Sequence, residues 1–134
     1  MGTGKTRSIR LGGTAIGGGA PVMVQSMTNT DTRDVSSTLA QIARLGEYGC
    51  EAVRLAVPDE AAARGLAAIR KGTRLPLIAD IHFDYRLALA AVEAGVEGLR
   101  INPGNIRKKP HLYRIVDAAK MHKAVIRVGV NGGS

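Results

Sequence analysis

The sequence has few of the residues that stack, cross-link or span a membrane. It contains no tryptophan, one phenylalanine and three tyrosines, whereas modules that bind single-stranded nucleic acids rely on aromatic stacking. Its one cysteine, Cys50, can neither form a disulfide within the chain nor hold a metal cluster by itself. No apolar run reaches the roughly 18 residues of a membrane span, and no apolar signal-like segment stands at the N-terminus. We therefore expect a cytoplasmic protein.

The residues that are abundant favour an α/β fold with an anionic partner. Hydrophobic residues make up 45% of the 134 residues. With so few aromatics, the core must consist of Val, Leu, Ile and Ala, as is typical of parallel sheets. The formal net charge is +8, an excess that serves either an anionic partner or a solvated surface. We interpret as solvated surface the residues Lys5, Arg7 and Arg10 and the run Arg107-Lys108-Lys109.

Strand-like and helix-like segments alternate along the chain. A hairpin is predicted from Arg7 to Ile16. Asp34 or Ser36 is the predicted cap of the first helix. Short apolar runs predict strands, and apolar residues at helical spacing predict helices. The predicted strands are Val22–Gln25, Ala52–Val57, Leu77–Ile81, Gly98–Ile101 and Val125–Val130, and the predicted helices end near Tyr48, Lys71, Ala94 and Lys123.

This alternation predicts a parallel sheet joined by right-handed crossovers. A complete (β/α)₈ barrel needs about 250 residues, and the chain has 134. We predict an α/β fold that is the first half of a TIM barrel, about βα units one to five, preceded by a small hairpin. Residues 1–134 would then form a partial substrate-binding domain. An open five-stranded sheet is the alternative.

Three of the predicted strands carry an arginine between apolar neighbours. These residues are Arg54, Arg100 and Arg127. A guanidinium cannot lose its proton to escape desolvation, so it needs a carboxylate or a ligand anion. Asp80 is the one acidic residue within the predicted strands. The shortage of carboxylates favours an anion from outside the chain, with phosphate as the first candidate.

Further polar residues lie on the same strands or directly after them. Side chains at positions i and i+2 of a strand share a face, so Asp80 is paired with His82 and Arg100 with Asn102. By the same spacing Arg127 shares its face with Asn131. We expect all of these groups, together with Gln25-Ser26 and Arg54, near the carboxyl ends of the strands, where parallel α/β folds bind ligands. Structural readings stay open: Asp80 as a counter-ion, His82 as a structural histidine and Asn102 as a turn residue.

Four motifs in order identify a family that this chain resembles. They are Ala20–Thr28 (APVMVQSMT), Ala79–Asp84 (ADIHFD), Leu99–Asn105 (LRINPGN) and Ile126–Ser134 (IRVGVNGGS). Together they extend over nearly the whole chain and resemble the 4-hydroxy-3-methylbut-2-enyl diphosphate synthases, iron–sulfur enzymes of isoprenoid biosynthesis by the methylerythritol phosphate route.

The resemblance implies a TIM barrel that binds 2-C-methyl-erythritol 2,4-cyclodiphosphate and an enzyme that opens this ring by two-electron reduction. Arg54, Arg100 and Arg127 would hold the diphosphate, as the sequence pattern also suggests. Asn102 and Asn131 would add hydrogen bonds, and Asp80 and His82 would line the same pocket. No residue is assigned as the catalytic acid.

The resemblance also implies parts that the sequence lacks. In the family, electrons from flavodoxin or ferredoxin pass through a four-iron, four-sulfur cluster held by three cysteines and a glutamate of a C-terminal domain, which closes over the barrel of the dimer mate. Nothing in residues 1–134 matches that domain, so we expect a piece of a longer homodimeric enzyme, inactive alone and binding no cluster. Two alternatives are another phosphate- or pterin-binding barrel, such as a dihydropteroate-synthase-like one, and a basic nucleic-acid-binding module.

Overall fold

The computed structural model describes residues 9–11 and 14–16 by their backbone, and residues 25–82, 84–102, 105–106 and 108–128 in full. Three parts of the sequence predictions lie outside these ranges. The first is the segment 22–24 of the first predicted strand, the second is the pair of residues 129–130 at the end of the last predicted strand, and the third is 131–134 with Asn131.

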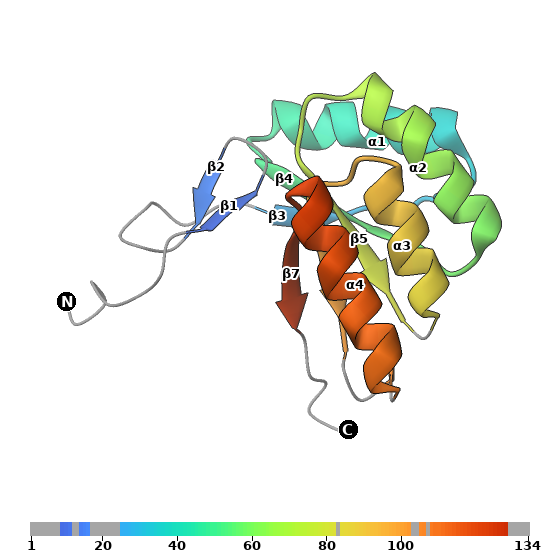
Figure 1. Cartoon of the computed structure of the whole chain (residues 1–134). Helices are drawn as coiled ribbons and strands as arrows, with labels where there is room; N and C mark the ends of the chain where they lie inside the picture. Colours follow the sequence, from blue (N-terminus) through green and yellow to red (C-terminus); the bar gives the residue numbers. More distant parts are fainter. Residues whose placement is uncertain are drawn as a thin grey trace.

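A short antiparallel hairpin precedes a five-stranded parallel sheet (Figure 1). The hairpin pairs β1 (Ile9–Leu11) with β2 (Thr14–Ile16). In the larger sheet, neighbouring strands are also successive strands of the chain, as in a barrel wall. Its strands are β3 (Gln25–Met27), β4 (Ala52–Ala56), β5 (Leu77–Ile81), β6 (Gly98–Ile101) and β7 (Val125–Val128).

One helix connects each pair of neighbouring strands. The helices are α1 (Val35–Glu47), α2 (Glu60–Gly72), α3 (Tyr85–Glu93) and α4 (Lys109–His122). Each of the first three begins at an aspartate whose carboxylate accepts a hydrogen bond from a backbone amide of the first turn. These caps are Asp34, Asp59 and Asp84, so the first helix uses Asp34 of the two predicted caps.

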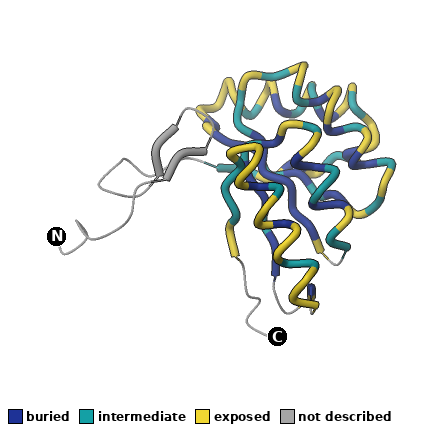
Figure 2. The backbone as a smooth tube through the Cα atoms, in the orientation of Figure 1, coloured by how far each residue is buried: buried dark blue, intermediate teal, exposed yellow. Residues whose placement is uncertain are grey.

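The sheet has two chemically different faces because side chains alternate along each strand. Odd-numbered positions of β4, β5 and β6, such as Leu55, Ala79 and Leu99, are buried with the helices in the main core. Even-numbered positions lie on the opposite, concave face, where Ala52 and Ile78 form a small second cluster with Val125. In Figure 2 the buried strands lie inside the layer of helices, whose outer sides are exposed.

The predicted alternation of strands and helices and the N-terminal hairpin are confirmed. One expected position is wrong: Gln25 was predicted to end the first strand, but β3 continues to Met27 and Gln25 pairs with Ala52, the first residue of β4. Gln25 therefore lies level with the amino end of β4. Among the described residues, no helix is both long enough and apolar enough to cross a membrane.

Candidate anion-binding site

Asp80 is the centre of a charged cluster on the concave face. It lies on β5, in register with Ala56 of β4 and Arg100 of β6, and its side chain is 4% exposed. Its Oδ2 is 3.3 Å from Nε of Arg54, and its Oδ1 accepts a hydrogen bond of 3.3 Å from Nη1 of Arg100. One buried carboxylate therefore serves two guanidinium groups.

The position of Arg54 differs from the sequence prediction. Arg54 is the middle residue of β4 and pairs with Ile78, two positions before Asp80, so it does not lie at the carboxyl end of its strand. Its long side chain nevertheless reaches the carboxylate of Asp80. Its Nε atom is buried and makes no hydrogen bond, although it lies within ion-pair distance of Oδ2.

Arg127 lies beside Arg100 in the register of β6 and β7, and its side chain is bonded across the sheet. Its Nη1 donates a hydrogen bond of 2.9 Å to Oε1 of Gln25, which lies on β3 at the opposite edge of the five-stranded sheet. The sequence places Gln25 among the polar groups near the ends of the strands, but it does not indicate this partner. No local pattern could predict a contact with a residue 102 positions away.

The charges of this face do not balance. On the concave side of the described parts of β3–β7, the charged residues are Arg54, Asp80, Arg100 and Arg127. Three guanidinium groups and one carboxylate leave two positive charges. The side chains of Arg54 and Arg100 are only 26% and 20% exposed, whereas Arg127 is exposed. Two of the three guanidinium groups are therefore poorly solvated, which favours binding of an anion.

His82 follows β5 at the mouth of the cluster. Its side chain is 49% exposed, and Nε2 is 3.8 Å from Oδ2 of Asp80, so the predicted pairing of these two residues on one face is confirmed. His82 also lines a small cleft of about 180 Å³ with Val57, Pro58, Asp84 and Leu87. A hydrogen bond from Arg86 holds the pKa of the Asp84 carboxyl below its ordinary value.

Asn102 directly follows β6 and is buried. Its backbone carbonyl accepts a hydrogen bond of 2.9 Å from the amide of Asn105, in agreement with its reading as a turn residue. Asn131 lies outside the described residues.

A larger groove, of about 640 Å³, lies elsewhere on the molecule. Residues of α2 and α3 line it, among them Ala63, Ala67, Ala90 and Leu87. It is on the helical side of the sheet and includes none of the concave-face arginines. We therefore choose the concave face as the candidate site on its charge pattern, not on the size of a groove.

The described residues do not supply a ligand set for a metal ion or cluster. They contain no group of three or more His, Cys, Asp or Glu side chains arranged to hold a metal. Cys50, the one cysteine of the sequence, is buried and its Sγ donates a hydrogen bond of 2.9 Å to the carbonyl of Ala52. An iron–sulfur cluster that needs several cysteines does not fit these residues.

Together, the successive parallel strands, the helices on one face and the cationic concave face define a class: a partial (β/α) barrel with a cationic inner face. Residues 6–134 match the family model described as the GcpE TIM-barrel domain. The chain belongs to this family, so its sheet is a segment of a TIM barrel and not an open sheet.

Relatives with curated names are similar over nearly the whole chain. The chain is 65% identical over 130 residues to 4-hydroxy-3-methylbut-2-en-1-yl diphosphate synthase (flavodoxin) of Lawsonia intracellularis, covering 97% of this chain and 36% of the relative. The same name belongs to a relative in Maridesulfovibrio salexigens, 61% identical over the same shares. It also belongs to one in Listeria monocytogenes serotype 4b, 54% identical over 96% of this chain and 35% of the relative. The chain thus spans about a third of the length of these relatives.

Solved structures with low sequence identity share the fold. A dihydropteroate synthase of Xanthomonas albilineans matches with a TM-score of 0.62 and 21% identity, over 97% of this chain and 52% of that chain. A mandelate oxidase variant with the C4a-OH-FMN adduct matches with a TM-score of 0.56 and 21% identity, over 81% and 43% of the two chains. Identity this low supports a common barrel architecture and carries no argument about ligands.

Proposed function

We propose that this chain is the diphosphate-binding part of a 4-hydroxy-3-methylbut-2-en-1-yl diphosphate synthase. The proposed reaction takes 2-C-methyl-D-erythritol 2,4-cyclodiphosphate, two electrons and two protons to the linear allylic diphosphate and water. The names of the relatives support the reaction class. The observation that carries the role of this chain is the excess of two positive charges around Asp80 on the concave face.

Each residue of the site has a proposed task in holding the substrate. Arg54, Arg100 and Arg127 neutralise the two phosphoryl groups, and the planar guanidinium groups suit paired phosphate oxygens. Asp80 orients two of these arginines and keeps them from spreading apart by repulsion. His82, at the rim of the site, contacts the part of the substrate ring that extends beyond the arginines. Asn102 and Asn131 add hydrogen bonds.

The reducing part of the proposed enzyme lies outside this chain. The four-iron, four-sulfur cluster expected for the family would supply electrons one at a time, and these residues offer it no ligand set. We propose that residues 1–134 bind and orient the cyclic diphosphate, and that cysteines outside this chain hold the cluster in a homodimer. Flavodoxin, named for the relatives, is the proposed electron donor.

The proposal is tested by calorimetric titration of the 134-residue chain with the cyclic diphosphate. Arg100→Met should weaken binding about 10-fold to 100-fold, because charged hydrogen bonds contribute about 1.5–3 kcal/mol. Arg127→Met, at a more exposed position, should weaken it about 5-fold. Arg64→Met is the matched control, because Arg64 lies on α2 with a 73% exposed side chain and pairs only loosely with Glu60.

Equal affinity of all three variants and the unmodified chain would show that the concave face does not bind the ligand. A parallel titration with a pterin and with a single-stranded oligonucleotide addresses the two alternatives. Binding of either one in place of the cyclic diphosphate would replace the proposed function.

A further inference from the structure

The loop from Thr28 to Asp34, between β3 and α1, is bound to the carboxyl half of β4. The backbone amide of Thr28 donates a hydrogen bond of 3.0 Å to the carbonyl of Arg54. The hydroxyl of Thr32 donates one of 2.7 Å to the carbonyl of Ala56. Both threonines are buried. Because β3 ends at Met27, the Thr32 hydroxyl takes the place of a backbone donor that the neighbouring strand no longer provides.

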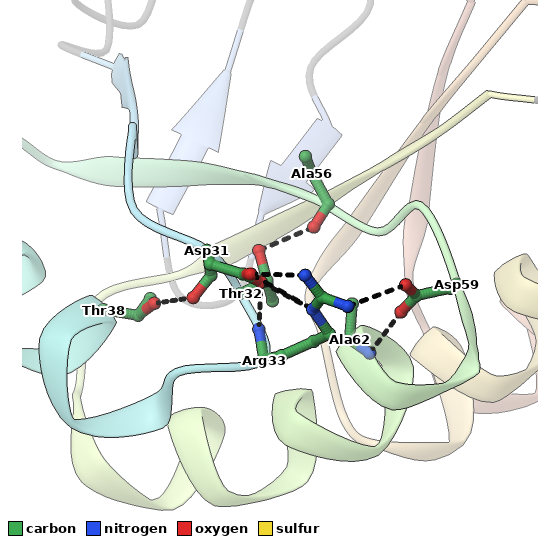
Figure 3. Close-up of polar contacts among 7 residues, drawn as sticks. All are labelled: Asp31, Thr32, Arg33, Thr38, Ala56, Asp59 and Ala62. Atoms are coloured by element: carbon green, nitrogen blue, oxygen red, sulfur yellow. Dashed lines mark hydrogen bonds and ion pairs between the residues drawn. The ribbon is translucent and has the colours of Figure 1, made fainter.

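The same loop is bound to two helices (Figure 3). The buried Thr38 of α1 donates its hydroxyl hydrogen to the carbonyl of Asp31, at 3.0 Å. Arg33 pairs with Asp31 at 2.7 Å and lies 3.6 Å from Oδ2 of Asp59. Asp59 is itself the cap of α2, where its Oδ1 accepts from the amide of Ala62. The loop is therefore fixed against β4, α1 and α2 at once.

These contacts act on the backbone that carries Arg54. The two carbonyls that the loop holds belong to Arg54 itself and to Ala56, which pairs with Asp80 in the register of β4 and β5. The buried Nε of Arg54 makes no hydrogen bond, so no directional bond at that atom fixes it 3.3 Å from Asp80. Its place therefore depends on the path of β4 and on packing, as well as on the ion pair with Asp80.

We propose that Thr32 is a positioning residue for Arg54 and hence for the anion-binding site. By its bond to the Ala56 carbonyl, Thr32 fixes the carboxyl end of β4 in the position that brings the guanidinium of Arg54 next to Asp80. Arg33 supports the loop through its ion pair with Asp59 at the start of α2. This inference rests on the proposed diphosphate site, although its effect on Arg54 can be measured without a ligand.

The test compares three variants in titrations with inorganic diphosphate. Thr32→Val removes the hydroxyl but keeps the shape and should weaken binding about 5-fold to 10-fold, the equivalent of one hydrogen bond. Thr32→Ser keeps the hydroxyl and should bind within about 2-fold of the unmodified chain. Thr73→Val is the matched control, because Thr73 Oγ1 accepts a bond of 3.2 Å from the Leu75 amide before β5, at the other end of the sheet. It should leave the affinity unchanged.

A second measurement follows Arg54 directly, through the NMR signal of its Nε–Hε group, assigned with Arg54→Lys. Burial of Nε should protect this proton from exchange with water. Thr32→Val should shift the signal and speed its exchange, whereas Thr32→Ser and Thr73→Val should not. If Thr32→Val does not fold, Arg33→Gln, at an exposed position, replaces it and should change the same signal.

The two measurements separate the two proposals. If the unmodified chain binds no diphosphate, the proposed site is wrong, and the Arg54 signal still decides whether Thr32 positions this residue. An unchanged Arg54 signal, or unchanged affinity in Thr32→Val when the unmodified chain does bind, overturns the positioning role.

Discussion

Gly65 gives a sharp test of how rigidly the β3–α1 loop is held. Gly65 lies within α2, where alanine is ordinarily favoured over glycine by about 1 kcal/mol. A Cβ atom at this position would lie 2.9 Å from the backbone carbonyl oxygen of Thr32. That oxygen belongs to a loop bonded on three sides, so it cannot move away as a flexible side chain would.

We therefore expect Gly65→Ala to destabilise the chain. Overpacking of this kind costs about 1–3 kcal/mol, which equals or exceeds the gain in helix propensity and leaves a net loss of up to about 2 kcal/mol. Gly46→Ala is the control, because Gly46 also lies in a helix and its added Cβ would meet only Leu75 Cδ1, at 3.5 Å. That variant should gain about 0.5–1 kcal/mol.

The assay is urea unfolding followed by circular dichroism, with the m-value checked for each variant. The double variant Gly65→Ala/Thr32→Val adds a direct test of mechanism. If the new methyl group displaces Thr32, the hydroxyl bond is already lost, so the two changes should cost less together than their sum. Equal gains in stability for Gly65→Ala and Gly46→Ala would refute the reasoning.

Three further predictions concern the remainder of the fold. Glu97 accepts hydrogen bonds from the Leu77 amide and from Arg70. Because the ion pair of Arg70 and Glu97 is largely buried, Arg70→Met should lower the free energy of unfolding in urea by about 2–4 kcal/mol. It should leave the affinity for diphosphate unchanged. The hydrogen bond from Arg33 lowers the pKa of Asp31 to about 2. The stabilisation of the fold by this pair should therefore be complete above about pH 4 and disappear as the pH falls through 2. In thermal unfolding, Arg33→Gln should lose less stability between pH 6 and pH 2 than the unmodified chain. The buried thiol of Cys50 should react with a thiol reagent only at the rate of unfolding, and fast labelling of the folded chain would contradict its position.

The sequence was sufficient for the architecture because the fold depends on local patterns. Short apolar runs recur in each βα unit, and the first three helices begin at a capping aspartate such as Asp59. The two-residue period of a strand also predicted correctly that Asp80 and His82 share a face.

Contacts between strands could not be predicted in the same way, since they depend on register and curvature. The reading of Asp80 as a counter-ion is confirmed, but nothing near it in the sequence indicates that its carboxylate contacts both Arg54 and Arg100. The middle position of Arg54 in its strand and the pairing of Gln25 with Arg127 also required the assembled sheet. The role of these residues in binding remains a prediction.

The bond between Gln25 and Arg127 also bears on which molecules can enter the barrel. Neighbouring strands lie about 4.8 Å apart, so in a flat sheet β3 and β7 would be about 19 Å apart, more than the two extended side chains can bridge. Their contact at 2.9 Å therefore requires the sheet to curve back on itself within five strands. A ligand of this face should place a slender charged end among the arginines and leave its bulk outside the rim, because a broad aromatic scaffold would have to displace this crossing first.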